Sequence, residues 1–409
     1  MNRRRFVKTL SLGSVSWMLS QRYGANLQAA LPQMKITRVR YYLPPNPRPI
    51  FNQSTGIVTI ETNQGITGIG EGGTKDMIEQ AASMLIGENP ARIEHLWQLM
   101  YRGYFYPAGR EKLHALGALD MALWDIKGKA LDLPVYELLG GLTRNYIECY
   151  ATAFPRQGSL KETARACMEA GFRAYRTSVA DPGDNQPFDA QRMIQRTVEQ
   201  CRQIREGVGP EGDWAIDYHT RLDLAEAVRL SRDLEELRPF FVEDLVRSEN
   251  PAVYRTLRQQ VRVPIAVGEQ FGDRWDLNEL VEQHLIDYSR VTIPNAGGLT
   301  EFLKIATLCE THYVGLIPHF TGPISTAALV HVCSASSCPV LMEMTGAGPR
   351  DEPHLPRHFD FKNGKLWPNS RPGLGVEFQP SRATQILEVR EHSAPLPLFH
   401  RPDGSLTNW

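Results

Sequence analysis

The sequence predicts an α/β protein in which a TIM-type (β/α)8 barrel follows a smaller α+β unit. Eight short apolar runs occur between residues 147 and 345, and each is followed by turn residues and an amphipathic stretch. Strands that alternate with helices indicate βαβ units, and eight units in one series favour a barrel over an open doubly wound sheet. The runs are 147–154, 172–179, 214–220, 240–245, 264–270, 288–294, 314–320 and 340–345.

The segment before the barrel has a different order, with strands first and helices second. Alternating apolar residues predict strands at 36–42 and 56–62, and the turn Asn63-Gln64-Gly65 leads into a third strand at 66–70. This order is typical of a small α+β unit. Helical periodicity predicts the helices of this unit at 74–87, 90–100 and 113–131.

The first thirty residues have the composition of a targeting segment and do not belong to the predicted fold. The basic run Arg3-Arg4-Arg5-Phe6-Val7-Lys8 precedes a short apolar stretch at 9–19. Paired arginines in this setting resemble the twin-arginine export signal, which predicts a periplasmic protein that is cleaved near residue 30. A basic disordered tail is the alternative. No later segment approaches ~18 consecutive apolar residues, so no transmembrane helix is expected.

Composition excludes several classes of protein but indicates no chemistry. The 409 residues include 45 Lys and Arg against 46 Asp and Glu, a net charge of −1, and 42% are hydrophobic. These values are ordinary for a globular protein, and the balanced charge gives no electrostatic footprint for nucleic acid or an anionic membrane. The six cysteines lack the paired spacing of a zinc site, and we interpret them as buried thiols.

Polar residues recur at one phase of the predicted barrel repeat. They are separated by 26, 26, 26, 24 and 24 residues, in the order Asp217, Glu243, Glu269, Asn295, His319 and Glu343. Each follows an apolar run, which places it at the carboxyl end of a strand. In barrels of this kind that rim carries the chemistry, whereas the opposite rim serves stability.

The first three of these residues are carboxylates on consecutive strands. A single acidic residue in such a place can simply favour the first turn of the next helix. Three of them on strands ~4.8 Å apart converge on one point, where unpaired charges repel and raise each other's pKa. A hard divalent cation relieves the repulsion, and a set of oxygen ligands favours Mg²⁺ over zinc. The predicted magnesium ligands are therefore Asp217, Glu243 and Glu269.

Two histidines flank the predicted metal site. His219 lies two residues beyond Asp217, so on a strand both side chains point the same way. His319 lies four strands further along the same rim. Histidines beside a metal are natural candidates for a general acid and a general base, although either one alone is more often a structural residue.

Two motifs of the chain resemble the signatures of a known family. One is the segment Ala115–Lys129 with its continuation at 134–140, and the other is Asp217-Tyr218-His219 followed by Val242-Glu243. They are similar to the two signatures of the mandelate racemase and muconate lactonizing enzyme group of the enolase superfamily. The similarity covers essentially all of residues 36–375.

This resemblance implies a more specific fold and a type of chemistry. The fold would be a modified (β/α)7β barrel at 141–345 with an α+β capping domain at 31–140, completed by the segment at about 350–409. The group's reactions start with removal of the proton α to a carboxylate, and an essential Mg²⁺ stabilises the resulting enediolate.

The resemblance also assigns roles to the polar residues at the rim. Asp217, Glu243 and Glu269 match the metal ligands of the group. His319 matches its histidine base, and Glu343 matches the acidic residue that hydrogen-bonds the substrate carboxylate.

Within the group, the motifs at 217–221, 296–301 and 318–319 most resemble galactonate-type sugar-acid dehydratases. The motif Glu243-Asp244 also resembles mannonate dehydratases. In both subgroups the histidine at the position of His219 protonates the departing hydroxide. The resemblance thus implies Mg²⁺-dependent dehydration of a sugar acid, an aldonate or uronate, to a 2-keto-3-deoxy acid, by a protein that commonly forms homo-oligomers.

Two arginines are expected near the substrate. Racemases of the group carry a Lys-x-Lys motif on the second strand, where this chain has Arg176-Thr177-Ser178. An arginine is always protonated and is a poor base, so lysine-based racemisation is not expected. Arg176 would bind a carboxylate or hydroxyl group of the substrate, or form a salt bridge at the barrel mouth. Arg221 is expected to bind the substrate as well.

One residue departs from the family pattern. The group usually pairs its histidine base with an Asp on the preceding strand, and here we place Asn295 at that position. Since an Asn can hold an imidazole but lacks the charge, a degenerate barrel that binds a sugar acid without turnover is an alternative function. A racemase or epimerase of the same fold is another alternative. At position 244, where a Pro is common in the group, this chain has an Asp.

The loops at 41–56 and 101–111 are expected to select the sugar acid.

Overall fold

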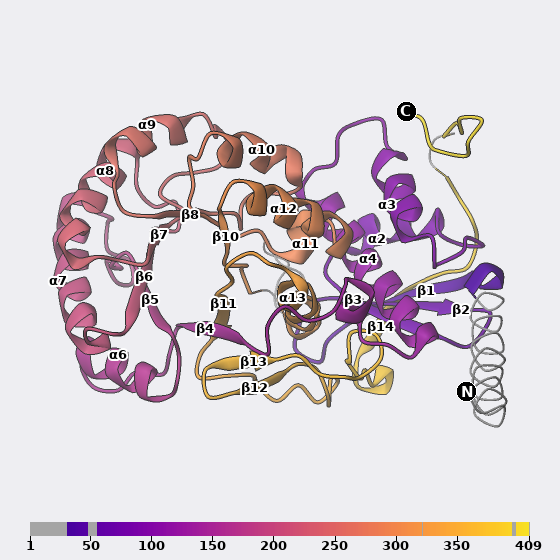
Figure 1. Cartoon of the computed structure of the whole chain (residues 1–409), viewed down its shortest axis with the longest axis horizontal. Helices are drawn as coiled ribbons and strands as arrows, with labels where there is room; N and C mark the ends of the chain where they lie inside the picture. Colours follow the sequence, from indigo (N-terminus) through magenta and orange to yellow (C-terminus); the bar gives the residue numbers. More distant parts are fainter. Residues whose placement is uncertain (1–30, 48–54, 321, 395–397, 409) are drawn as a thin grey trace, which may run out of the picture.

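The structure, a computed structural model, describes residues 31–47, 55–320, 322–394 and 398–408. The predicted export signal at 1–30 lies outside the described residues. Figure 1 shows a ring of helices around strands on one side of the molecule and a smaller unit of sheet and helices on the other. No helix in the described ranges combines the length and apolar character needed to cross a membrane.

The smaller unit, the cap, is built on an antiparallel sheet. Its strands in the described residues are β1 (Ile36–Leu43), β2 (Ile57–Thr62), β3 (Thr67–Glu71) and β14 (Thr384–Val389). They lie in the order β14-β1-β2-β3, so a strand near the C-terminus pairs with the first strand of the cap. The three strands predicted near the N-terminus are confirmed, and Gly65 in the turn between β2 and β3 has a φ of 75°.

Three helices of the described residues complete the cap, and all were predicted. They are α2 (Lys75–Ser83), α3 (Ile93–Arg102) and α4 (Arg110–Leu131). α4 is buried along most of its length. It packs against β3 on one side, and on the other against α11 (Ile293–Ala296) and α12 (Leu299–Thr311) of the second unit. The cap and the second unit therefore share one central helix.

The second unit is a barrel of eight parallel strands among the residues that the structure describes. Neighbours in sequence pair in space, the last strand pairs with the first, and a bridge between Leu316 and Val340 completes the ring. Each predicted run contains one strand. The strands are β4 (Ile147–Thr152), β5 (Ala174–Ser178), β6 (Asp213–Asp217), β7 (Phe241–Glu243), β8 (Ile265–Val267), β9 (Tyr288–Ser289), β10 (Gly315–Leu316) and β11 (Met342–Thr345).

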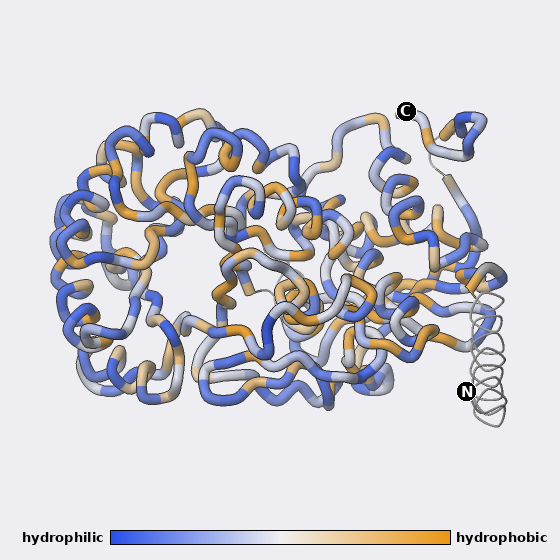
Figure 2. Tube along the Cα trace, viewed as in Figure 1, coloured by the Kyte–Doolittle hydropathy of each residue, from blue (hydrophilic) through white to orange (hydrophobic). Residues whose placement is uncertain are grey.

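One main helix follows each strand except the last, so the described residues form the (β/α)7β barrel that the family resemblance implies. The helices are α6 (Leu160–Glu169), α7 (Ala190–Val208), α8 (Leu224–Asp233), α9 (Val253–Gln260), α10 (Arg274–Glu282), α12 (Leu299–Thr311) and α13 (Pro323–Ala335). Figure 2 shows hydrophilic segments on the outer side of this ring and hydrophobic segments toward the strands. Shorter helices are α5 (Val135–Leu138), η1 (Leu31–Gln33), η2 (Glu235–Leu237) and η3 (Pro380–Arg382).

The C-terminal segment divides between the two units. A hairpin of β12 (Asp360–Lys362) and β13 (Lys365–Trp367) pairs with β4 of the barrel. β14 instead pairs with β1 of the cap. The segment that we expected to complete the cap therefore contacts the barrel first.

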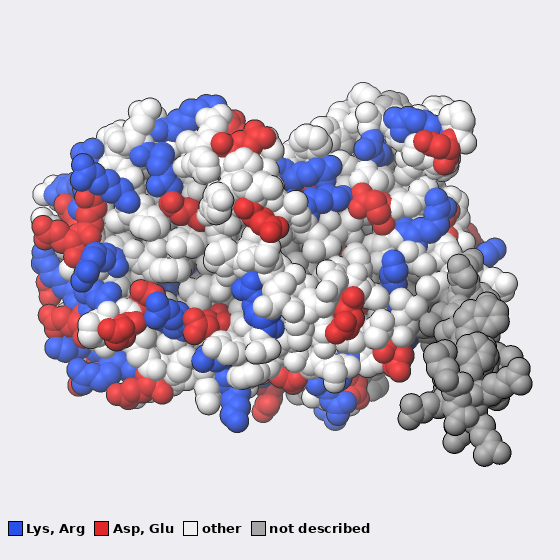
Figure 3. All heavy atoms as spheres, viewed as in Figure 1, with Lys and Arg blue, Asp and Glu red and all other residues white. Residues whose placement is uncertain are grey.

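Two expectations from composition can be compared with the structure. All six cysteines are buried free thiols, as predicted. On the face of the molecule in Figure 3, Lys and Arg side chains are interspersed with Asp and Glu. This face has no large patch of a single sign, of the kind that nucleic acid or an anionic membrane attracts.

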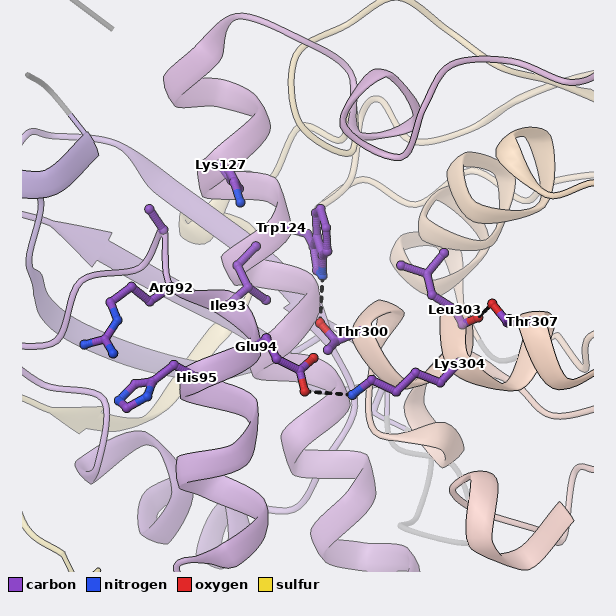
Figure 4. A pocket seen from close by; sticks show the side chains of 11 residues that line it. Arg92, Ile93, Glu94, His95, Trp124, Lys127, Thr300, Leu303, Lys304 and Thr307 are labelled. Atoms are coloured by element: carbon purple, nitrogen blue, oxygen red, sulfur yellow. Dashed lines mark hydrogen bonds and ion pairs between the residues drawn. The ribbon is translucent and has the colours of Figure 1, made fainter. Parts of the chain in front are cut away.

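Helices α4 and α12 form the junction between the cap and the barrel. Asp120 in α4 accepts hydrogen bonds from the backbone N of Thr300 at 3.0 Å and from its hydroxyl at 2.6 Å, so it caps the N-terminus of α12. Figure 4 shows the adjoining surface pocket, where Trp124 donates to Thr300 at 3.0 Å and Lys304 pairs with Glu94 at 2.8 Å. None of the described residues that line this pocket is a predicted site residue.

Gly298, just before α12, is expected to be essential for this junction. Its φ is 110°, and a Cβ atom there would lie 2.3 Å from Oδ2 of Asp120. Gly298→Ala should lower the free energy of unfolding by at least ~3 kcal/mol, because left-handed strain, a steric clash and a weakened cap add together. Urea unfolding followed by circular dichroism measures this loss.

Gly140→Ala is the matched control for that substitution. Gly140 has a φ of 109° and no neighbouring atom within 4 Å of the added Cβ. Its replacement should therefore cost only the ~1–2 kcal/mol of left-handed backbone strain. Equal losses in the two variants would show that the contact of Gly298 with Asp120 has no special role.

Candidate active site

Two of the predicted metal ligands meet at the carboxyl ends of β6 and β7. Asp217 ends β6, Glu243 ends β7, and the two residues are opposite each other in the parallel register. Both are buried. Asp244 follows Glu243 with a φ of 45°, which turns its carboxylate toward the same point. Oxygen atoms of these three side chains lie within 4.8 Å of one another, so they could hold one metal ion.

Asp244 belongs to the site, although sequence reasoning did not place it among the predicted site residues. Its Oδ2 is buried and has no hydrogen-bond partner among the described residues. Burial, together with the negative charges of Glu269 and Asp217, raises the pKa of Asp244 well above its ordinary value. A buried carboxylate oxygen without a donor is what a bound cation would satisfy.

Arg176 on β5 forms a salt bridge inside the carboxylate cluster, one of the two roles that we expected. Its Nη1 lies 2.8 Å from Oδ2 of Asp217 and 2.7 Å from Oε2 of Glu243. Its Nη2 lies 3.2 Å from Oε1 of Glu343, and its Nε donates to the hydroxyl of Thr152 at 2.9 Å. Only 8% of the Arg176 side chain is exposed.

Arg290 is a second buried arginine, and sequence reasoning missed it. It follows β9 directly, and its side chain is fully buried. Its Nε lies 2.5 Å from Oε1 of Glu243, and its Nη2 lies 2.9 Å from Oε2 of Glu343 and 3.5 Å from Oε2 of Glu269. An arginine inside a predicted apolar run is a signal that could have indicated this role, since such a charge must be paired.

Glu343 on β11 is held as an anion by the two arginines. Burial alone would raise its pKa, but Arg290 and Arg176 hold the pKa of Glu343 well below its ordinary value. The hydroxyl of Thr152 donates to Oε1 at 2.7 Å, and the backbone N of Phe320 donates to Oε2 at 3.1 Å. An ionised carboxylate accepts hydrogen bonds, and the contact of Glu343 with a substrate carboxylate stays a prediction.

The two predicted histidines meet at Glu269, which follows β8. Nε2 of His219 lies 3.7 Å from Oε1 of Glu269, and Nε2 of His319 lies 3.4 Å from Oε2. Burial lowers the pKa of His319 and outweighs the opposing effect of Glu269 and Glu343. The lowered pKa favours the neutral imidazole that a base requires. The His219 side chain is 54% exposed, so it can exchange protons with solvent.

The placement of His219 corrects one detail of the sequence interpretation. β6 ends at Asp217, and His219 has a φ of 51° rather than a strand conformation. Its backbone N donates to Oδ1 of Asp217 at 2.6 Å. A left-handed turn, not strand alternation, therefore directs His219 toward Glu269.

Asn295 does not lie at a strand end as we expected. Thr292 and Pro294 begin the short helix α11, since a proline suits the first turn of a helix, and Asn295 falls within that helix. The Asn295 amide donates to the carbonyl of Glu269. The described hydrogen bond of Asn295 therefore ties α11 to the Glu269 segment.

Arg221 forms no ion pair with these carboxylates among the described residues. Its Nη1 donates to the backbone carbonyl of Val179 at 3.1 Å, which joins the loops that follow β6 and β5. The guanidinium is at the rim, and its role in substrate binding stays a prediction.

A cavity of about 600 Å³ opens beside these groups. Arg176, His319 and Glu343 line its inner end, and residues 348–354 after β11 line its outer wall. Described residues of the cap contribute from one predicted loop, 41–56, but none from the other, 101–111. The described part of the cap thus supports only one of the two loops as a determinant of specificity.

The residues present fit a divalent cation. Five buried or nearly buried carboxylates share two arginines, which leaves an excess of negative charge. They are Asp217, Glu243, Asp244, Glu269 and Glu343. An oxygen-only ligand set suits Mg²⁺. Of the predicted ligands, Asp217 and Glu243 belong to the group with closely spaced oxygens, whereas Glu269 lies outside it and its role as a ligand stays a prediction.

Comparison with known proteins agrees with the two-part architecture. Residues 48–140 match the mandelate racemase / muconate lactonizing enzyme N-terminal domain, and residues 159–382 match the enolase C-terminal domain-like family. D-galactonate dehydratase from Pectobacterium atrosepticum is 34% identical over 395 residues, which cover 92% of this chain and 100% of that protein.

Solved structures share the same fold. An enolase from Pantoea ananatis, with bound D-gluconate and Mg, has a TM-score of 0.77 at 30% identity and covers 86% of this chain and 94% of its own. A member of the enolase superfamily from Salmonella Typhimurium has a TM-score of 0.80 at 26% identity and covers 87% and 100%. Both domains and nearly the whole length agree, so this chain belongs to the mandelate racemase and muconate lactonizing enzyme family of the enolase superfamily.

Proposed function

We propose that this protein is a Mg²⁺-dependent hydro-lyase that converts a sugar acid to a 2-keto-3-deoxy acid. The observation that carries the proposal is the convergence of two histidines on one carboxylate beside an acidic cluster. His319 and His219 approach different oxygens of Glu269, at 3.4 and 3.7 Å, from loops that follow different strands. The His319 side chain is nearly buried and the His219 side chain is half-exposed, so the two lie in different surroundings.

His319 acts as the general base. Its nearly buried, neutral imidazole removes the proton from C2 of the sugar acid, and the electron pair of that C–H bond moves into the carboxylate to form an enediolate. Burial makes this step possible near neutral pH, because it disfavours the imidazolium that could not accept a proton.

His219 acts as the general acid. Its imidazolium gives a proton to the hydroxyl on C3 as the C–O bond breaks, and water leaves. The electron pair of the enediolate forms the C2–C3 double bond, and the resulting enol takes up a proton at C3 to become the 2-keto acid. The exposed ring of His219 is then recharged from solvent.

The chain's acidic residues would hold the metal. Asp217 and Glu243, with Asp244 or Glu269, are the oxygen ligands that the structure offers. When bound, Mg²⁺ supplies positive charge that stabilises the negative charge developing on the substrate carboxylate. Arg290 holds Glu243 and Glu343 in place from the far side.

The relatives indicate which acids to try first. Some are named D-galactonate dehydratases, and the structure from Pantoea ananatis holds D-gluconate and Mg. D-Galactonate and D-gluconate are both six-carbon aldonic acids with hydroxyl groups on C2 and C3. We therefore propose an acid of this class as the substrate.

The test is an assay of residues 31–409 with Mg²⁺ against a panel of aldonic and uronic acids, with detection of 2-keto product. We expect at least one six-carbon aldonic acid to be dehydrated, and EDTA to abolish the reaction. A panel without any product would contradict the proposal.

Two alternative functions give different readings in the same panel. A racemase or epimerase would exchange the C2 proton in deuterated water and invert C2 without forming a 2-keto acid. A degenerate barrel would bind a sugar acid in a calorimetric titration with no later heat of reaction; the neutralisation of Glu243 by two arginines is the observation that favours it.

We also propose export by the twin-arginine route and assembly as a homo-oligomer. The buried, unpaired cysteines suit a protein that folds in a reducing cytoplasm before export. Changing Arg3 and Arg4 to Lys should retain the protein in the cytoplasm of a host with this route.

Light scattering of the purified protein gives the oligomeric state, and a mass of one chain would exclude an oligomer.

A further inference from the structure

The carboxylates expected to bind Mg²⁺ are already engaged by the chain itself. Oδ1 of Asp217 accepts from the backbone N of His219, and its Oδ2 accepts from Nη1 of Arg176. Oε2 of Glu243 accepts from the same Nη1, and its Oε1 lies 2.5 Å from Nε of Arg290. A single Nη1 atom thus bridges Asp217 and Glu243. A cation that binds both residues has to share or replace these donors.

The two arginines differ in their freedom to move. Arg290 is fully enclosed, and its Nη1 also contacts the Tyr150 hydroxyl and donates to the Ile317 carbonyl at 3.1 Å. Arg176 instead lines the 600 Å³ cavity. Because the guanidinium is a rigid plane, a turn that takes Nη1 away from Asp217 and Glu243 also shifts Nε and Nη2, so the contacts with Thr152 and Glu343 change with it.

Building on the proposed function, we propose that Arg176 is an exchangeable counter-cation of the metal site. Its guanidinium neutralises Asp217 and Glu243 until Mg²⁺ binds, and then turns into the cavity to bind the carboxylate of the sugar acid. Two cations that share the same two carboxylates repel each other strongly in a buried site. The displaced guanidinium needs a new anion, and the substrate carboxylate provides it.

Displacement of Arg176 couples the two ligands. Mg²⁺ makes Arg176 available to the sugar acid, and the sugar acid holds Arg176 away from the metal ligands. By thermodynamic linkage, each ligand then raises the affinity of the other by the same factor. A fixed Arg176, in contrast, would give no contribution to such coupling.

The experiment is calorimetric titration of the metal-free protein with Mg²⁺. Arg176→Gln should bind Mg²⁺ at least tenfold more tightly than the wild type, because no guanidinium competes for Asp217 and Glu243. Arg176→Lys, which keeps the charge but cannot make the same forked contacts, should give an intermediate affinity. Arg247→Gln is the matched control, since Arg247 is an exposed arginine that pairs with Glu249, and its affinity should stay within twofold of the wild-type value.

A second titration uses the wild type with and without D-gluconate. We expect D-gluconate to tighten Mg²⁺ binding at least fivefold, and Arg176→Gln to reduce that factor. An affinity of Arg176→Gln that equals or falls below the wild-type value overturns the proposal. If Arg176→Gln does not fold, either of two other results overturns the proposal. Arg176→Lys binds Mg²⁺ with the wild-type affinity, or D-gluconate leaves the Mg²⁺ affinity of the wild type unchanged. These readings need no turnover, so a failure of the dehydratase proposal is recognised separately, by the absence of 2-keto product.

Discussion

His319→Asn is expected to lower the rate of dehydration by a factor of ~10²–10⁴, the usual contribution of a general base. The same variant should lose exchange of the C2 proton with deuterated water, because both processes begin with proton transfer to His319. The side chain is nearly buried at 12% exposure, and Asn fills part of its volume, so the fold should persist. Mass spectrometry of the recovered acid measures exchange, and the 2-keto product measures dehydration.

His219→Asn is the paired variant that separates the two steps. Removing the acid should suppress dehydration but leave proton exchange at C2 close to the wild-type rate, because His319 is retained. The two variants thus differ in exchange, not in dehydration. If His219→Asn lost exchange while His319→Asn kept it, the two roles would be reversed, and normal dehydration in both would exclude the histidines from the reaction.

The barrel and its rim were predictable because they depend on local pattern and pairing of neighbours. Each predicted run contains a strand, and Asp217 and Glu243 are brought together by the parallel register of β6 and β7. Equal spacing in sequence predicts neighbouring positions only while the strands have similar lengths. β9 is a pair of residues, Tyr288–Ser289, and Asn295 falls within the helix α11 that follows it instead of at a strand end. Counting residues could not detect that change.

The residues that were missed depend on tertiary pairing. Arg290 is buried because several carboxylates from other strands surround it, and no local pattern in its own segment names those partners. Asp244 joins the cluster through a left-handed φ that a non-glycine residue rarely adopts. The sequence also left open whether Arg176 binds the substrate or forms a salt bridge. The salt bridge depends on where Asp217 and Glu243 lie in the folded chain.

Glu243→Gln is expected to abolish both turnover and the response to Mg²⁺. Glu243 is fully buried and, like Glu343, contacts both arginines. Burial, which outweighs the lowering effect of Arg176 and Arg290, raises the pKa of Glu243 well above its ordinary value, and Asp217 adds to the rise. Gln keeps the size of the Glu side chain and one acceptor oxygen for the arginines, so the metal-free variant should still fold.

The difference appears when Mg²⁺ is added. The wild type should gain stability with increasing Mg²⁺, as any protein does when a ligand binds only its folded state. Glu243→Gln should gain little, because an amide offers Mg²⁺ one neutral oxygen in place of an anionic pair. Its dehydration rate should fall by at least ~10³, which is ~4 kcal/mol of transition-state stabilisation. Glu249→Gln, at an exposed residue that pairs with Arg247, is the control and should behave as the wild type. A Glu243→Gln variant with normal Mg²⁺-dependent stability would place the metal away from β6 and β7.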